Sequence, residues 1–373
     1  GGQGGGGDAG TEGADNGKPG LNNTGGGGGA SQDDVNSYDD GGDGGSGVVL
    51  VRYEGTEPLL SGGTTSVVNV GGTDYTVHSF TNTNGTHDLE YNSAREKRAW
   101  VDGKITGSGY VTLGDADGTL ELTAANDVTG DITVTGGTVE VTGSLPDTAA
   151  VQVNSTGTYK AAATDTIGQV TGDGTVEVDG SGTTLSVGND NADSTFAGAI
   201  AGSGNFNKVG TGTVTLTGDS DYAGTTTVSA GILSIGDGGT SGSLKAGNGI
   251  TVENGGALQS NRSDDLTLES IITGAGQVIK EGTGTLTMAG DSDYSGGTVV
   301  KTGTLKPGIN STIDTAPNPD VITSGAFGTG TVTVEDGAEL NLNGFKVEND
   351  LTLTGMGVGG DGGALTHSGS NTA

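Results

Sequence analysis

Two pairs of aspartates show the spacing that most suggests chemistry in this sequence. Asp219 and Asp221 recur as Asp291 and Asp293, each pair within the phrase Gly-Asp-Ser-Asp-Tyr. Paired carboxylates hydrolyse glycosidic bonds, one as the acid and the other as base or nucleophile. Here, however, each pair is followed by Tyr and Gly, and Asp with Gly is typical of tight turns. Because a catalytic pair has no reason to recur within a repeated phrase, we expect repeated turns and no enzyme.

Four other aspartates resemble parts of calcium-binding loops. Asp115 and Asp117 stand two positions apart, and Asp190 and Asp193 three apart. Calcium takes six to eight oxygen ligands, and an EF-hand loop ends in a glutamate at its twelfth position. Counted from Asp115, that position is Asn126. We therefore expect at most weak Ca²⁺ binding at these four aspartates, and no other cofactor.

The remaining reactive side chains are scattered or sparse. His78, His87 and His367 lie too far apart in sequence to indicate a metal cluster or a catalytic triad. One tryptophan, Trp100, and eight tyrosines make a poor carbohydrate platform. We expect Tyr222 to pack over a corner of the fold instead, as does its repeat equivalent.

A short basic cluster follows the only helix signal in the chain. The run from Ser93 to Glu96 fits a capping box, which predicts one or two helical turns over residues 94–100. Arg95, Lys97 and Arg98 would then form a solvated basic face of this helix.

Composition excludes several classes of partner. The chain of 373 residues has 14 Lys and Arg against 46 Asp and Glu, a formal net charge of −32. Nucleic-acid binding needs cations for phosphate contacts, and anionic membrane surfaces attract the same residues. No apolar run reaches the ~20 residues that span a bilayer, so we expect no membrane insertion. With no cysteine, disulfides and thiolate metal sites are excluded as well.

An internal repeat predicts the architecture. Residues 202–236 and 274–308 are identical at 19 of 35 positions, at an offset of 72, and a weaker copy begins at Thr119, at an offset of 94. Both offsets are near multiples of about 24, a length typical of solenoid coils. Apolar residues and Thr alternate within each copy, as in Val214 and Leu216, which indicates short strands with one buried face. We therefore predict an all-β fold, a right-handed parallel β-helix with about 24 residues per coil.

The repeat alignment also predicts which side chains point inward. Val300 aligns with apolar residues in both other copies, whereas Val299 and Lys301 align with Thr or Ser. Val300 should therefore face the core and its two neighbours the solvent. Positions that are the same in both strong copies and lie in the corner phrase should be structural: Asp221, Tyr222, Gly224, Asp293, Tyr294 and Gly296.

Four regions follow from composition along the chain. Residues 1–47 are glycine-rich and of low complexity, which favours a linker, although close packing of polyglycine segments is an alternative. Residues 48–106 read as a small β-rich module, 107–357 as the β-helix and 358–373 as a tail. No charged-then-apolar leader opens the chain, so we expect an internal piece of a longer protein.

The repeats resemble the autotransporter-associated β-strand repeat. The phrase Gly-Thr-Gly-Thr, followed by Gly-Asp-Ser-Asp-Tyr and a Thr-x-Val strand, occupies Gly210 to Leu233 and Gly282 to Leu305. The front of the chain resembles bacterial and phage glycine-rich domains, in which a polyglycine stretch ends in an aliphatic strand like Val48 to Tyr53, and a Tyr-x-x-His-x-Phe strand opens the next module, as at Tyr75 to Phe80. The first resemblance implies a secreted passenger domain on the outer surface of a Gram-negative cell.

Two classes of function follow from these resemblances. The first is a surface-displayed structural or adhesive module that attaches to host or neighbouring cells, to glycans or to itself. The alternative is a fibre or spike on the virion surface of a phage that binds or degrades host glycans. Such an enzyme would need an irregular insertion rich in carboxylates and aromatics. Only residues 309–321 break the repeat, and their run from Asn310 to Pro317 holds one carboxylate and no aromatic, which favours the adhesive module. The oligomeric state is left open.

The acidic charge should make stability depend on salt. Repulsion among surplus carboxylates destabilises the compact state, and salt screens it over about 8–10 Å. We expect the melting temperature to rise with NaCl and to rise further with millimolar Ca²⁺ at matched ionic strength. Calorimetry in both salts checks this, and a flat response to both would contradict it.

Overall fold

The computed structural model describes residues 49–54, 60–61, 64–70, 73–80, 90–91, 98–315, 321–360 and 362–368. The glycine-rich segment 1–47 and the start of the predicted helix, residues 94–97, lie outside them. The chain forms two compact units, Gly1–Pro146 and Asp147–Ala373. The boundaries expected from composition, after residues 47, 106 and 357, remain predictions.

The predicted all-β class is confirmed. The described residues hold strands and one short 3₁₀ segment, η1 (Val358–Gly360). Among these residues no helix has the length and apolarity needed to cross a bilayer.

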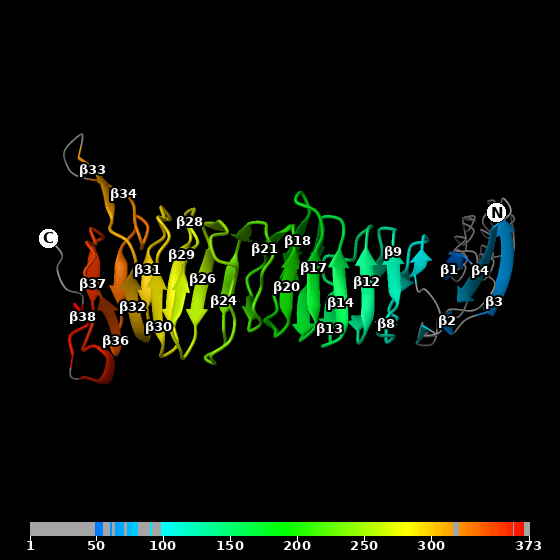
Figure 1. The fold of residues 1–373 in the computed structure, drawn as a ribbon, viewed down its shortest axis with the longest axis horizontal. Helices are drawn as coiled ribbons and strands as arrows, with labels where there is room; N and C mark the ends of the chain where they lie inside the picture. Colours follow the sequence, from blue (N-terminus) through cyan, green and yellow to red (C-terminus); the bar gives the residue numbers. More distant parts are fainter. Residues whose placement is uncertain are drawn as a thin grey trace, which may run out of the picture. The chain divides into compact units, whose positions relative to one another are not determined.

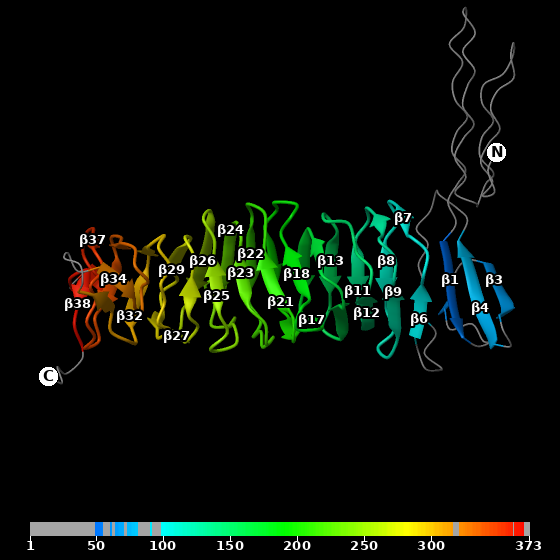
Figure 2. The ribbon, with the colours of Figure 1, turned by 90° about the horizontal axis from the view of Figure 1, so that it is seen from above.

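The first unit begins with an antiparallel sheet. Strands β1 (Val49–Glu54), β4 (Thr73–Phe80) and β3 (Thr64–Val70) lie side by side in that order (Figure 2). A two-residue pair, β2 (Leu60–Ser61) with β5 (Glu90–Tyr91), is also antiparallel. β1 pairs antiparallel with β6 (Arg98–Val101).

Parallel stacking in the first unit starts at β6. Strand β6 pairs parallel with β9 (Thr119–Leu122), which pairs with β12 (Gly137–Val141). Two further parallel pairs are β8 (Val111–Leu113) with β11 (Ile132–Val134), and β7 (Thr106–Gly107) with β10 (Asp127–Val128). The helix expected over residues 94–100 is therefore wrong from Arg98 onward. Ala99 and Val101 alternate into the core, and burial at period two favours a strand over a helical turn.

The second unit is a parallel solenoid with two or three strands per coil (Figure 1). Its first face is made by β13 (Ala150–Val153), β16 (Gln169–Gly172), β19 (Ser194–Phe196), β22 (Thr213–Leu216), β24 (Gly231–Ile235), β26 (Gly256–Asn261), β29 (Gln277–Glu281), β31 (Thr298–Val300), β35 (Val332–Val334) and β37 (Leu351–Leu353). Successive strands on this face belong to successive coils.

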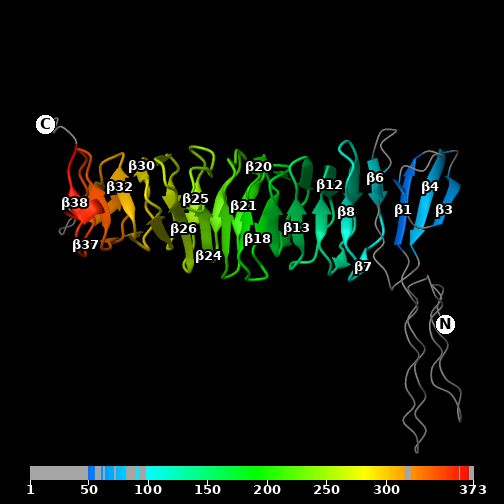
Figure 3. The ribbon, with the colours of Figure 1, turned by 90° about the horizontal axis from the view of Figure 1, so that it is seen from below.

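The other two faces complete each coil. The second strand of a coil is one of β14 (Gly157–Ala161), β17 (Thr175–Val178), β20 (Ala199–Gly202), β27 (Leu266–Leu268), β30 (Thr285–Met288), β32 (Gly303–Pro307), β36 (Ala338–Asn341) and β38 (Leu365–Thr366); β30, β32 and β38 lie together in Figure 3. The third face holds β15 (Asp165–Ile167), β18 (Thr184–Val187), β21 (Asn205–Lys208), β23 (Thr226–Val228), β25 (Ile250–Val252) and β28 (Ile272–Thr273).

The core is a set of apolar columns along the stack. Leu286 lies between Leu266 and Leu305 on the coils before and after it, and Leu305 pairs on with Leu340. Such columns remove apolar area from water although each strand contributes only every second residue. The predicted register is confirmed at Val300, which is fully buried, whereas Val299 is only partly buried.

The coil is shorter than the repeat offsets predicted. On the third face, Phe206 pairs with Thr226, then Ile250, then Ile272, so that three coils lie between positions 206 and 272, an average of 22 positions per coil. The repeat equivalent of Phe206 is Val278, six positions further on and already on the first face. The repeat offset of 72 therefore spans about three and one third coils, and the second strong copy is rotated by one face relative to the first.

Coil length varies because the turns vary. In the second unit the spacing between paired positions ranges from 17, between Thr158 and Thr175, to 25, between Gly231 and Gly256. It reaches 34 between β31 and β35 and 35 between β32 and β36. That long coil contains an antiparallel hairpin, β33 (Thr312–Asp314) with β34 (Val321–Ser324), which projects from the stack in Figure 1. It matches the predicted break at residues 309–321.

A pair of substitutions on one strand tests the register. Leu286→Asp would bury an unpaired carboxylate between two leucines, at a cost of several kcal/mol. Thr287→Asp, on the outward side of the same strand, should change the unfolding free energy by less than about 0.5 kcal/mol. Leu286 is a sharper test position than Val300, which pairs with the inward Lys280, a cation that would neutralise an introduced carboxylate.

Urea unfolding and limited proteolysis around residue 286 measure both effects. Equal stability of the two variants, or the opposite order, would show that the inward register is wrong.

Candidate functional site

The two Asp-Ser-Asp-Tyr segments form the same corner on different faces of the solenoid. The Asp221 amide donates to the carbonyl of Ile200 in β20, at 2.9 Å. The Asp293 amide donates to the carbonyl of Ile272 in β28, at 3.0 Å. β20 and β28 belong to different faces, as a repeat of three and one third coils requires. The two carboxylate pairs are therefore not arrayed along one side of the molecule.

All four aspartates of these corners are exposed. Asp219 accepts a hydrogen bond from the Ser243 hydroxyl at 2.7 Å. A carboxyl that acts as a general acid near neutral pH is held protonated by burial or by a neighbouring charge. These corners are exposed rather than buried, and Asp219 is hydrogen-bonded to a serine of a neighbouring coil, which fits a turn better than a catalytic pair.

The buried serine between the aspartates ties each corner to the preceding coil. The Ser220 hydroxyl accepts from the amide of Ile200 at 3.3 Å, and the Ser292 hydroxyl from the amide of Ile272 at 3.0 Å. The Ser292 hydroxyl also donates to the carbonyl of Gly290. The segment that resembles a catalytic motif thus contains a serine whose hydroxyl forms a hydrogen bond to the preceding coil.

The tyrosine of each corner points inward. Tyr222 and Tyr294 are fully buried, and their hydroxyls lie 2.6 and 2.5 Å from those of Thr226 and Thr298. The Tyr222 ring also packs against Phe206, with centroids 6.2 Å apart. Burial raises the pKa of Tyr222 to about 12 and raises the pKa of Tyr294 further.

Glycine is required where each corner crosses the coil before it. A Cβ atom at Gly224 would lie 2.1 Å from the carbonyl oxygen of Gly204, and one at Gly296 would lie 2.2 Å from that of Gly276. Both distances are far inside van der Waals contact. The repeat residues Tyr222, Gly224, Tyr294 and Gly296 therefore serve the packing of coils.

The four calcium candidates lie in two separate turns. Asp115 accepts from the Asp117 amide in the first unit. In the second unit, Asp190 accepts from Gln169 at 2.6 Å and from the Ala192 amide, and Asp193 accepts from the Thr213 amide at 2.7 Å. Over the part of the chain that the structure describes, no group of three or more His, Asp or Glu is placed to hold a metal ion. Weak Ca²⁺ binding at these aspartates stays a prediction.

The other singled-out residues lie apart. His78 is in β4, His367 is exposed near the C-terminus, and His87 is outside the described residues. Trp100 is a partly buried residue of β6, and Tyr110 is 51% exposed.

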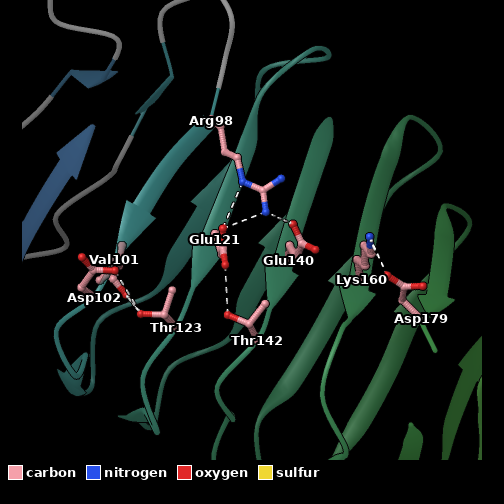
Figure 4. Close-up of polar contacts among 9 residues, drawn as sticks. All are labelled: Arg98, Val101, Asp102, Glu121, Thr123, Glu140, Thr142, Lys160 and Asp179. Atoms are coloured by element: carbon pink, nitrogen blue, oxygen red, sulfur yellow. Dashed lines mark hydrogen bonds and ion pairs between the residues drawn. The ribbon is translucent and has the colours of Figure 1, made fainter. Parts of the chain in front are cut away.

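Arg98 joins two glutamates on neighbouring coils of the first unit (Figure 4). Glu121 pairs directly with Glu140 across β9 and β12. The Arg98 guanidinium lies 2.7 Å from Glu121 and 2.5 Å from Glu140, and the Thr142 hydroxyl donates to Glu121. These charge-assisted bonds, first of all the one to Glu121, raise the pKa of Arg98. Arg98 is therefore a bridge between coils, not part of a basic helix face.

In the second unit, Lys160 and Asp179 form a simpler pair at 2.9 Å (Figure 4).

Two buried lysines went unnoticed in the sequence. Lys208 and Lys280 occupy equivalent positions of the two strong repeat copies and are almost inaccessible to solvent. The Lys208 ammonium donates to the carbonyls of Val209, Gly210 and Ala230, at 2.6 to 3.2 Å. The Lys280 ammonium is held in the same way.

The Lys280 ammonium donates to the carbonyls of Glu281, Gly282 and Thr302, at 2.5 to 3.1 Å. Gly282 has a φ of +81°, a conformation that glycine adopts without strain. Burial lowers the pKa of Lys208 and of Lys280 to about 8, although Asp193 and Asp190 oppose the shift at Lys208 and Glu281 opposes it at Lys280. The sequence does contain a signal for these buried lysines, because both strong copies have Lys at the same inward position.

Three segments of the chain, residues 117–141, 206–235 and 278–306, match the Passenger-associated-transport-repeat family. They contain most of both strong copies and of the weak copy after Thr119, so the predicted resemblance is confirmed. The buried Lys280 and Tyr294 both lie within the third segment.

Part of the chain is similar to part of a known adhesin. The chain is 30% identical over 218 residues to the "Adhesin BmaC autotransporter" of Brucella suis biovar 1 (strain 1330). The match covers 48% of this chain and 6% of that protein, so this chain spans a small part of the relative's length. No solved structure matches the chain. Neither the family match nor the similarity to this adhesin supports the phage-fibre alternative.

The buried lysines and tyrosines predict a stability maximum at alkaline pH. Each lysine has a lower pKa in the folded than in the unfolded state, where it is near 10.4. The unfolded chain therefore binds more protons above pH 8, and stability should rise from about pH 8 to pH 10, by at most about 2 kcal/mol per lysine. Above about pH 10 the buried tyrosines reverse the trend, because only the unfolded chain ionises them.

Urea unfolding at several pH values measures this maximum. Lys208→Met with Lys280→Met should remove the rise below pH 10, and Tyr294→Phe should weaken the fall above it. Lys301→Met, at a partly exposed position, is the matched control and should keep the rise. A rise that survives the double substitution would contradict the assignment.

Proposed function

We propose that this chain is a segment of an autotransporter passenger displayed on the outer surface of a Gram-negative cell. In this role the solenoid is a non-enzymatic stalk whose outward faces attach the cell to a host or neighbouring surface. The proposal goes beyond the family of the repeats, because it assigns the adhesive role to this stretch of chain.

The proposal rests on one observation: the residues that are identical in both repeat copies hold the coils together. The buried Tyr294 and Lys280 face into the stack, and Gly296 allows two coils to approach closely. A repeat whose most regular side chains hold coils together builds a scaffold, and the outward residues that vary between copies are free to meet partners. Passenger repeats and the similarity to an adhesin favour the same conclusion.

Coated beads test adhesion directly. Beads carrying the full chain should attach to epithelial monolayers or to Gram-negative cells several-fold more than albumin-coated beads. Thr287→Asp, on an outward face, serves as a folded control for Leu286→Asp, which adds the same charge but opens the core. Attachment that is no better than albumin, or equal for folded and opened chains, would count against the proposal.

Enzyme assays test the non-enzymatic part. We expect no turnover of common polysaccharides. Turnover that Asp291→Asn or Asp293→Asn abolishes would show that the exposed corner is catalytic after all.

A further inference from the structure

The first unit ends its sheet with an unusually long strand. Within the described residues, β3 has seven residues, pairs with β4 alone and is the last strand of its sheet (Figure 2). Every other described strand at the end of a sheet has two to four residues. A strand with one open edge presents a row of backbone N–H and C=O groups to which another strand can bind. We call this side of β3 the β3 edge.

The β3 edge lacks the features that keep open edges from pairing. Folded proteins protect such edges with charged side chains, proline, bulges or very short strands. The run Thr64–Val70 contains no charged residue and no proline, and its pairing with β4 has no register shift. Val67 and Val68, whose side chains point to opposite faces of the sheet, are 50% and 45% exposed. The composition of β3 therefore favours pairing with a further strand.

The register of β3 on β4 indicates which backbone groups face the open edge. Val70 pairs with Thr73 across a connection of two residues, and the pair that closes such a hairpin is a hydrogen-bonded one. Hydrogen-bonded and non-hydrogen-bonded pairs alternate along an antiparallel ladder. Thr65 and Val67, at odd distances from Val70, therefore direct their N–H and C=O groups toward the β3 edge.

A side-chain contact supports this assignment. Asn69 pairs with Asp74, and the Asn69 amide donates to the Asp74 carboxylate at 2.6 Å. Side chains lie closer together in a non-hydrogen-bonded pair, which is the kind of pair that the alternation assigns to this position. The same contact holds the Asp74 carboxylate on the β4 side of Asn69.

We propose that β3 pairs antiparallel with β3 of a second copy of this chain, with the two-fold axis at Val67. This contact is separate from the adhesive role proposed above and does not depend on it. Antiparallel pairing of identical strands obeys a two-fold axis, so each bond that one copy forms is repeated by the other. An axis at Val67 overlaps all seven residues and sets Val67 opposite its own counterpart, where both exchange N–H and C=O bonds.

Charge favours a second copy as the partner strand. Two chains of net charge −32 repel one another, and the repulsion is smallest where the facing segments carry no carboxylate. β3 meets this condition, because none of its residues is acidic. In the proposed register Thr65 faces Asn69 of the second copy, and both side chains can donate and accept hydrogen bonds.

The length of β3 predicts a weak contact. Seven residues extend over about 24 Å, and a single strand pair of this length buries less than the about 1,200 Å² of a stable protein interface. We therefore expect a reversible equilibrium between monomer and dimer.

A cysteine introduced into β3 tests both the contact and its register. The chain has no cysteine, so Val67→Cys supplies its only thiol. In the proposed dimer the two Cα atoms at this position are about 5.5 Å apart, a distance that a disulfide can bridge. The Val67→Cys chain should form a disulfide-linked dimer under mild oxidation, measured on non-reducing gels.

Val68→Cys is the matched control, because Val68 is exposed to a similar extent. The proposed axis sets Val68 opposite Ser66 of the second copy and about 8 Å from its own counterpart, which is beyond the about 7 Å limit for a disulfide. Val67→Cys should therefore cross-link at least tenfold faster than Val68→Cys.

Sedimentation of full chains without cysteine tests the contact by charge. The unmodified chain should show a concentration-dependent dimer at about 0.15 M NaCl. Val67→Asp should weaken the dimer at least tenfold, because two carboxylates then face one another across the axis. Mixing Val67→Asp with Val67→Lys should restore it, since opposite charges then meet. Circular dichroism and melting temperature check that all variants are folded.

Three results would overturn the inference. The first is equal cross-linking of the two cysteine variants, or faster cross-linking of Val68→Cys, because the proposed register excludes both. The second is a chain that stays monomeric at every concentration, or a mixture of Val67→Asp and Val67→Lys that stays as weak as Val67→Asp alone. The third is a monomeric chain that binds a synthetic alternating Thr-Val peptide at β3, which would assign the β3 edge to a different extended partner.

Discussion

Each strand of this solenoid depends on the coils before and after it for its hydrogen bonds. A strand of two to six residues has no stability of its own in water, so backbone groups must be paired between coils along the whole stack. This constraint explains why glycine is needed at Gly224 and Gly296, where an added Cβ would lie 2.1 and 2.2 Å from a carbonyl oxygen of the preceding coil. It also explains the apolar columns, because a column contributes burial only while its coils remain in register.

The same constraint creates a difficulty at the turns. A turn with glycine in the left-handed region aims carbonyl oxygens away from the strand ladder, and a buried carbonyl without a donor is costly. Lys208 and Lys280 resolve this difficulty because each ammonium donates three hydrogen bonds to turn carbonyls. Asn349 does the same for the carbonyls of Gly328 and Gly330. The depressed pKa of each lysine is the cost of placing an ammonium inside the stack.

The sequence predicted the parts of the fold that depend on local pattern. Period-two alternation predicted the inward position of Val300, and the broken repeat located the β33–β34 hairpin. The coil length was overestimated because the repeat offset was divided by three, and nothing local shows that the repeat ends on another face. The helix predicted over residues 94–100 was wrong at Arg98. A capping box is a weak local signal, and the pairing of β6 with β9 overrides it. The buried lysines required knowing where the turn carbonyls point, which is a property of the folded coil.

Stacking also decides where the carboxylates lie. A charge on one coil faces the same position on the next about 4.8 Å away, so two acidic residues in register repel strongly. In the parallel strands of the second unit only Asp165, Glu177, Glu281 and Glu339 are acidic, and none is paired with another acid. The first unit has one such pair, Glu121 with Glu140, and there Arg98 binds both carboxylates. Most of the acidic residues of the second unit therefore lie in its turns, where strand pairing does not set two carboxylates opposite one another.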